Sequence, residues 1–289
     1  MESNGLPDIQ SEKKNRHSSQ PYSGIQKVGM SQVQIPVRWK GQILAGTADI
    51  FVNLLEGKSR GIHMSRLYSS LLVKLTNEEL NLRSLSQLGN DLVKTQEGLS
   101  TESYLKIAFS LPLETKALKS GLPGFRSYPI CLEIKTGLDQ QSCQLSFQIL
   151  YSSTCPQSAA LSLELWKEEA KKHQSVDWIE RLQSMPATPH AQRSKAEIKI
   201  EIKSTSEYDF ESWILQAEKC LTTPVQTLVK RADEQEFARL NGENTMFCED
   251  SVRRIESWLK GKPDVLSYWA RVEHQESLHP HNAVAEIHN

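Results

Sequence analysis

The sequence has few cysteines, no long apolar run and no excess of charge of either sign. Its 289 residues include five cysteines, an odd number with no Cys-x-x-Cys pair, which is typical of a reducing compartment rather than of a disulfide framework. No stretch approaches the roughly 20 apolar residues that a membrane span needs. Residues 1–20 lack the apolar run of a secretory signal. These absences predict a soluble globular protein of the cytoplasm.

The charge balance excludes further classes. Lys and Arg number 34 against 35 Asp and Glu, which gives a formal net charge of −1 and argues against a strongly basic nucleic-acid binder. With 38% hydrophobic residues, the chain is not a disordered polyelectrolyte. It carries no Gly-rich phosphate loop, so it is not a P-loop protein. A local cationic pocket for a phosphate-bearing ligand stays open, because net charge does not describe the distribution of charge.

Hydrophobic periodicity predicts the secondary structure. Residues 1–27 are rich in Ser, Asn, Gln and Lys without periodicity, so we expect a mobile arm. Gly89 is unfavourable inside one of the predicted helices. The expected strands are 28–37, 43–55, 104–109, 128–134, 143–151, 196–202, 265–273 and 283–287, and the expected helices are 63–72, 82–93, 161–183, 210–221 and 249–259.

The order of these elements is similar in the two halves of the chain. We expect an α+β fold with two tandem β-β-α-α-β-β domains, each an antiparallel sheet with helices on one face. The expected boundaries are an arm at 1–27, a first domain at 28–156, a helical insertion at 157–189 and a second domain at 190–289. The halves share no visible sequence identity, so the repeat is one of element order only.

Four turn-rich places carry side chains that can bind a metal. They are Cys155 before Pro156, His190 before a strand, the segment 230–234 between two predicted helices, and the segment 276–282 with His279 and His281. Each also has a purely structural explanation: a lone cysteine is commonly a small buried hydrophobe, a histidine before a strand is commonly at the surface, and acids after Lys230 and Arg231 can cap a helix. Spacing alone therefore neither establishes nor excludes a metal site.

Seven short strings in a fixed order carry a resemblance over nearly the whole chain. They are LPDIQ at 6–10, GIHMSR at 61–66, CP at 155–156, HAQRS at 190–194, KRADE at 230–234, ED at 249–250 and ESLHPHNA at 276–283. In these strings the sequence resembles the type IB GTP cyclohydrolases. The resemblance implies tunnelling-fold domains, two per chain, and a homotetramer with active sites at subunit interfaces. It also implies conversion of GTP and water to 7,8-dihydroneopterin triphosphate and formate, the first step of pterin and folate biosynthesis.

The resemblance also implies a set of site residues. A divalent metal (Mn²⁺, Fe²⁺ or Zn²⁺) is expected on Cys155, His190, Glu234 and His279. Cys155 and Glu249 are the expected catalytic residues, and Glu276 matches the carboxylate that anchors the amidine edge of a purine or pterin. Candidates for the triphosphate are Arg66, Arg193, Lys230 and Arg231, since guanidinium groups bind phosphate oxygens in pairs.

Some of these assignments have alternatives. Glu249 suits proton transfer if its pKa is raised, but it is also placed as a helix N-terminal acid. Glu276 either anchors the substrate or is an exposed carboxylate at a strand end. His63 either contributes to the pocket or only begins a helix.

The chain departs from the family in three places. The usual Cys-Pro-Cys-Ser-Lys is CPQSA at 155–159, so the second cysteine and the lysine are absent, and the usual His-Asn-Gln-Arg is HAQR at 190–193. The connection from Cys155 to His190 is 35 positions long, which resembles the longer form of some members. His173 inside this connection is a competing ligand, but the Lys and Glu around it favour a solvated helix face.

Two other functions remain open. One is a tunnelling-fold reductase or synthase on a related purine or pterin, in which Cys155 is the nucleophile and a nicotinamide cofactor is used. That function leaves the His190 and His279 strings unexplained. The other is a non-catalytic paralogue that keeps the fold as a binding module, which the altered residues around Cys155 and His190 favour.

Overall fold

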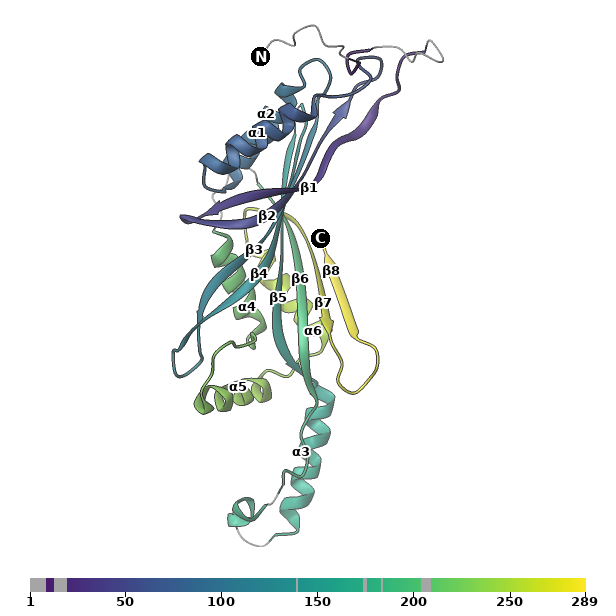
Figure 1. Cartoon of the computed structure of the whole chain (residues 1–289). Coiled ribbons are helices and arrows are strands. Elements are labelled where there is room, and N and C mark those ends of the chain that lie inside the picture. The colour runs from purple at the N-terminus through teal and green to yellow at the C-terminus, as the bar shows by residue number, and fades with distance from the viewer. Residues whose placement is uncertain (1–8, 13–19, 139, 174–175, 183, 204–208) are drawn as a thin grey trace.

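One continuous antiparallel sheet of eight strands runs through the computed structural model, in the order β1 to β8 (Figure 1). The structure describes residues 9–12, 20–138, 140–173, 176–182, 184–203 and 209–289. The strands are β1 (Ile25–Trp39), β2 (Gln42–Leu54), β3 (Ser103–Lys116), β4 (Pro123–Thr136), β5 (Gln141–Thr154), β6 (Ala191–Ile202), β7 (Val265–His274) and β8 (Ala283–His288).

Helices cover one face of this sheet. The helices of the described chain are α1 (Met64–Asn77), α2 (Leu82–Thr95), α3 (Pro156–Lys171), the 3₁₀ helix η1 (Val176–Arg181), α4 (Phe210–Leu221), α5 (Arg231–Glu243) and α6 (Cys248–Lys260), of which all but α3 and η1 lie against the sheet (Figure 1). Helices α1 and α2 contact β1 and β3–β5, whereas α4 and α6 contact β5, β7 and β8. Helix α3 and η1 project from the end of the sheet (Figure 1). Within the described ranges, no helix is long and apolar enough to span a membrane.

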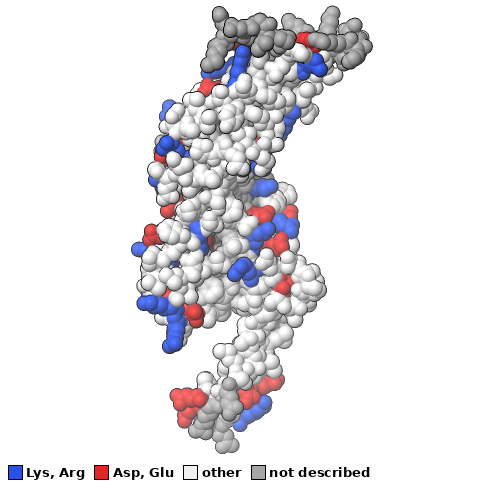
Figure 2. All heavy atoms as spheres, viewed as in Figure 1, with Lys and Arg blue, Asp and Glu red and all other residues white. Residues whose placement is uncertain are grey.

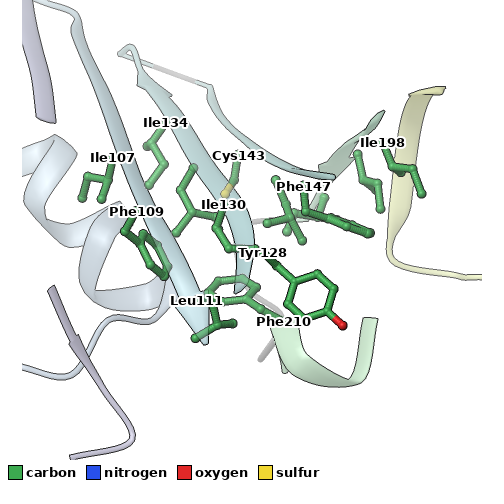
Figure 3. Close-up of a cluster of buried hydrophobic side chains, with 14 of the residues drawn as sticks. Ile107, Phe109, Leu111, Tyr128, Ile130, Ile134, Cys143, Phe147, Ile198 and Phe210 are labelled. Atoms are coloured by element: carbon green, nitrogen blue, oxygen red, sulfur yellow. The ribbon is translucent and has the colours of Figure 1, made fainter. Parts of the chain in front are cut away.

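The alternation in the sequence follows from this one-sided cover. Ile107 lies opposite Leu132, which lies opposite Leu145, and the row continues through Ile200 to Tyr268. All five side chains are buried on the helix-covered face, and Figure 3 shows the neighbouring part of this core. Residues between them point to the uncovered face, since successive side chains of a strand alternate.

The expected α+β class, with an antiparallel sheet and helices on one face, is confirmed. The two halves are not separate sheets, however, because β5 of the expected first domain pairs with β6 of the expected second domain along nearly its whole length. Strand β5 also pairs with β4, so the sheet is continuous across the expected boundary. The division into two tandem domains stays a prediction.

Helix α5 was not expected, and its anchor explains why. Its larger apolar residues are Phe237 and Leu240, both only half-buried, and the residue that it buries is Asp233. The Asp233 carboxylate accepts the backbone N–H of Lys119 at 2.7 Å, of Ser120 at 2.8 Å and of Lys230 at 2.8 Å, together with the Ser120 hydroxyl at 2.6 Å. These hydrogen bonds, those from Ser120 foremost, hold the pKa of Asp233 far below its usual range. A polar anchor of this kind gives no hydrophobic period.

Two other local features differ from expectation. Gly89 lies inside α2, where a Cβ atom would come within 2.2 Å of Thr136 Oγ1, so the glycine allows the helix to approach β4.

Strand β1 begins at Ile25 rather than at Val28. Before it, the carbonyl of Gln10 accepts backbone N–H groups from residues 60 and 61 at 3.0 and 3.2 Å, so part of the expected arm is held against the body. Residues 1–8 and 13–19 of the arm lie outside the described residues.

Candidate functional site

At one end of the sheet the helix-covered face changes from apolar to polar. The side chains concerned, here called the polar end, are Tyr151, Ser153, Gln192, Ser194, His274 and Glu276. Ser194 lies opposite Tyr151 on one side and His274 on the other, and Ser153 lies opposite Gln192. Because these positions continue the buried rows of β5, β6 and β7, the core register places them on one face.

Buried hydrogen bonds hold the polar end together. His274 Nε2 lies 2.9 Å from the Tyr151 hydroxyl, which donates to Ser251 Oγ of α6 at 3.0 Å. The hydroxyls of Ser153 and Ser194 are 2.8 Å apart. Burial lowers the pKa of His274 to about 4, against a smaller opposite effect of the Glu249 charge. His274 is therefore neutral at pH 7, and it fixes the strand end that leads to Glu276.

The buried histidine makes stability depend on pH. In the unfolded chain a histidine titrates near pH 6.5, so between about pH 6.5 and pH 4 the unfolded state binds more protons than the folded state. The contribution of His274 to the free energy of unfolding is then fully present above this window. It decreases as the pH falls, by about 2 kcal/mol between pH 7.5 and pH 5. Urea unfolding at both pH values measures it.

Two variants separate this effect from other acid effects. His274→Gln should remove about 2 kcal/mol of the pH dependence, whereas His288→Gln, an exposed change on β8, should retain it. An unchanged pH dependence in His274→Gln would contradict the assignment.

Glu276 is held just beyond the end of β7. The backbone N–H of Gln275 donates to the Arg193 carbonyl at 3.1 Å and extends the β6–β7 pairing. The Gln192 side chain donates through Nε2 to Glu276 Oε1 at 3.3 Å. The other carboxylate oxygen, Oε2, is 3.5 Å from His190 Nε2 but has no hydrogen bond, and neither has Gln192 Oε1. Both oxygens are buried, so an N–H-bearing ligand would satisfy them.

The chain also brings Cys155 and His190 together at the base of α3. Cys155 precedes the helix, and its backbone N–H donates to the His190 carbonyl at 3.2 Å. The His190 backbone N–H in turn donates to Ser158 Oγ at 3.0 Å. Thiol and imidazole groups are donors that a divalent metal accepts. Cys155 and His190 are therefore neighbours through their backbones, as a shared site requires.

The full set of four predicted metal ligands does not assemble within one chain. Among the described residues, no group of three or more His, Cys, Asp or Glu side chains could hold a metal ion. Glu234 is exposed in the first turn of α5. His279 is exposed in the β7–β8 loop, where its ring stacks on that of His281 at 5.0 Å between centroids. Glu234 and His279 stay predicted ligands.

Glu249 has a lowered pKa. It lies in the first turn of α6 and is exposed. The pKa of Glu249 is lowered by hydrogen bonds, first from its own backbone N–H and then from the Cys248 thiol. The thiol Sγ donates to Glu249 Oε2 at 3.3 Å. The lowered pKa agrees with the alternative of a helix N-terminal acid, because the helix N-terminus and the thiol both favour the ionised form.

Within the described part of the chain, the contacts of the Glu276 carboxylate are with Gln192 and His190 and not with the predicted phosphate and pocket residues. His63 precedes α1, and its backbone N–H and carbonyl bond to the Gln96 side chain at 2.9 and 3.1 Å. Helix α1, with exposed Arg66, lies toward the opposite end of the molecule from α3 (Figure 1). Arg193 is exposed and alternates with Gln192, so it belongs to the uncovered face. Lys230 and Arg231 are exposed where α5 begins.

Surface charge does not single out another site. Figure 2 shows Lys and Arg interspersed with Asp and Glu over one face of the molecule. A hollow on the uncovered sheet face is lined by Lys106 and Glu133, which pair at 3.6 Å, and by Tyr104, whose ring faces Lys27 and Lys135. These charges face one another rather than converging on a common point.

The competing ligand His173 has a structural role. Its ring stacks on that of Trp178 at 5.3 Å between centroids, and its Nε2 lies 3.2 Å from Glu169 Oε1. It is exposed near the end of α3, as the alternative interpretation expected. Gln192 belongs to the HAQRS string at 190–194, but neither it nor His274, Tyr151 or Ser251 was among the predicted site residues. The signal available was the alternation of β6 and β7, which places Gln192 and His274 on the covered face.

The fold resembles that of uricases. The chain superposes on uricase from Arthrobacter globiformis with a TM-score of 0.52 and 10% identity, covering 92% of this chain and 94% of that one. Urate oxidase from Bacillus sp. TB-90 gives 0.52 and 10%, with 91% and 99% covered. At this identity the likeness concerns the fold alone, and it defines the class as an α+β protein with a tunnelling-like fold.

The sequence comparisons identify the family. The family model described as type I GTP cyclohydrolase folE2 matches residues 6–285. A relative named GTP cyclohydrolase FolE2 from Bdellovibrio bacteriovorus is 41% identical over 301 residues, with 99% of this chain and 97% of the relative covered. One from Hydrogenovibrio crunogenus is 38% identical over 280 residues, with 92% and 90% covered. The chain belongs to the folE2 family of type I GTP cyclohydrolases.

Proposed function

We propose that this protein is a metal-dependent GTP cyclohydrolase of the cytoplasm, which converts GTP and water to 7,8-dihydroneopterin triphosphate and formate, the first step of pterin and folate biosynthesis. The observation that carries the proposal is the Glu276 carboxylate at the polar end, with one buried oxygen that has no hydrogen bond. Further support comes from relatives that carry the name GTP cyclohydrolase FolE2 and that this chain matches over 90% or more of their length.

Glu276 recognises the guanine edge in this proposal. An ionised carboxylate accepts the N1–H and one N–H of the 2-amino group in two charge-assisted hydrogen bonds. Adenine has no 2-amino group and no hydrogen on N1, so it would leave the buried Glu276 Oε2 without a hydrogen-bond donor. Gln192 donates to the carboxylate and holds it in place for this contact, while His274 anchors the end of β7 through its hydrogen bond with Tyr151.

Cys155 and His190 hold the metal in this proposal, and Glu234 and His279 complete the set in the assembled homotetramer. A divalent ion (Mn²⁺, Fe²⁺ or Zn²⁺) supplies a bound water whose pKa is lowered toward about 7. The adjacency of Cys155 and His190 supports this assignment. Gln157 and Ala159, where the family has cysteine and lysine, replace none of the four ligands.

Glu249 serves as a proton acceptor in this scheme. The reaction adds water across C8–N7 of guanine, opens the ring and releases C8 as formate, after which the sugar rearranges and the pterin closes. Because its pKa is lowered, Glu249 is ionised at neutral pH and can take up a proton rather than begin as the acid.

The remaining predicted residues reach the substrate from a neighbouring subunit. Helix α1, which follows His63 and contains Arg66, lies toward the opposite end of the molecule from α3, which follows Cys155 (Figure 1). His63 and Arg66 can therefore meet the same GTP as Cys155 only at a subunit interface, where we place the active sites of a homotetramer. Arg193, Lys230 and Arg231 are the further cations proposed for the triphosphate. Two tunnelling-fold domains per chain are part of the same proposal.

One experiment tests the function against its alternatives. Protein loaded with Mn²⁺, Fe²⁺ or Zn²⁺ is incubated with GTP, the product is oxidised, and pterin fluorescence and formate are measured together. Equal amounts of both are expected. Absence of product with all three metals contradicts the proposal. Consumption of NADPH with a pterin or purine substrate would favour the reductase, and GTP binding without turnover would favour the non-catalytic paralogue.

A further inference from the structure

Gln192 is a second buried polar side chain whose hydrogen-bonding capacity is only partly used. It is 7% exposed and donates through Nε2 to Glu276. Its Oε1 is buried without a hydrogen bond, as is Glu276 Oε2. Exchanging the amide nitrogen and oxygen would set Oε1 against the carboxylate oxygen, so the pairing with Glu276 fixes which atom faces the ligand.

The backbone holds this acceptor in a defined place. Gln192 lies in β6 opposite Ser153 of β5, and the next residue, Arg193, accepts the N–H of Gln275. Gln192 and Glu276 therefore sit on directly paired backbone. Acceptors on such rigid elements are preorganised for a ligand rather than arranged by it.

We propose that Gln192 is a specificity-determining residue, whose Oε1 accepts the second N–H of the 2-amino group of the base. This inference rests on the proposed function and deepens it. Glu276 accepts N1–H and the first N–H of the amino group, and Gln192 accepts the remaining one. The three donors of guanine's edge are then all satisfied. A hypoxanthine base, which has N1–H but no 2-amino group, leaves Gln192 Oε1 buried and unpaired, which is unfavourable.

The test compares GTP with ITP as substrates. Gln192→Met keeps the length of the side chain but removes the amide oxygen Oε1 and the amide nitrogen Nε2. Loss of the bond to Glu276 affects the two nucleotides alike, whereas loss of Oε1 affects only GTP. The ratio of kcat/KM for GTP to that for ITP should therefore fall about tenfold, as expected for one hydrogen bond. Gln148→Met, on the uncovered face of β5, is the matched control and should leave the ratio unchanged.

The outcomes separate this inference from the proposed function. Equal losses for GTP and ITP in Gln192→Met would overturn it, because Gln192 would then only position Glu276. If wild-type protein turns over neither nucleotide, the proposed function fails, and the ratio of GTP to ITP dissociation constants replaces kcat/KM. An unchanged ratio would again overturn the inference. Thermal unfolding monitors folding, and Gln192→Leu replaces the methionine variant if that one does not fold.

Discussion

Glu276→Gln should lower kcat/KM for GTP about a thousandfold while the protein stays folded. The change keeps the shape of the side chain but replaces one acceptor oxygen by an NH₂ group and removes the charge. Two charge-assisted hydrogen bonds to the guanine edge are weakened or lost, a loss of about 4 kcal/mol, and each 1.36 kcal/mol is a factor of ten. Steady-state kinetics of pterin formation measure the effect.

A matched control is a second carboxylate, which lies three residues earlier in the sequence, on β7. Glu273 on β7 interacts with Arg271 and Asn282 instead of the polar end, so Glu273→Gln should leave kcat/KM within about twofold of wild type. GTP kinetics that are unchanged in Glu276→Gln would remove the anchoring role of this carboxylate.

Cys155→Ala should abolish metal binding and metal-dependent turnover. We expect the affinity for Mn²⁺ or Zn²⁺ to fall at least about a hundredfold, since loss of a ligand should exceed the 10–100-fold typical of second-shell changes. The fold should persist, because Cys155 begins α3 without a side-chain capping hydrogen bond and is only half-buried. Metal content after dialysis and circular dichroism measure the two effects.

The control for this variant is another cysteine. Cys131 lies on β4, where Sγ contacts Glu133 on the uncovered face, and Cys131→Ala should bind metal as wild type does. Full metal-dependent activity in Cys155→Ala would refute the ligand assignment, whereas loss of metal in both variants would show that folding rather than ligation had changed.

The strands could be predicted because the sheet is covered on one face only. Each strand then alternates apolar and polar residues, as in Glu197 to Ile202. Helix α5 could not be predicted, because Asp233 anchors it through hydrogen bonds. The single sheet was also missed, since the pairing of β5 with β6 joins segments separated by α3 and depends on contacts that no local pattern carries.

The candidate site could be predicted in part. Short strings of the chain pointed to Cys155, His190 and Glu276, and the structure places the first two side by side and His190 Nε2 3.5 Å from Glu276 Oε2. Gln192 and His274 depend on strand register, which sequence alone specifies weakly. The lowered pKa of Glu249 depends on the helix start and on the Cys248 thiol, which a linear pattern does not reveal.

In the proposed function, the register of β7 against β6 determines both the folding of the sheet and the binding of the base. A slip of one residue would turn Ala270 and Val272 out of the core and, with them, aim Glu276 at the opposite side of the sheet. With the proposed role of Glu276, a misregistered chain would lose guanine binding as well as stability. The position of this carboxylate therefore depends on the same register that buries the apolar residues preceding it on β7.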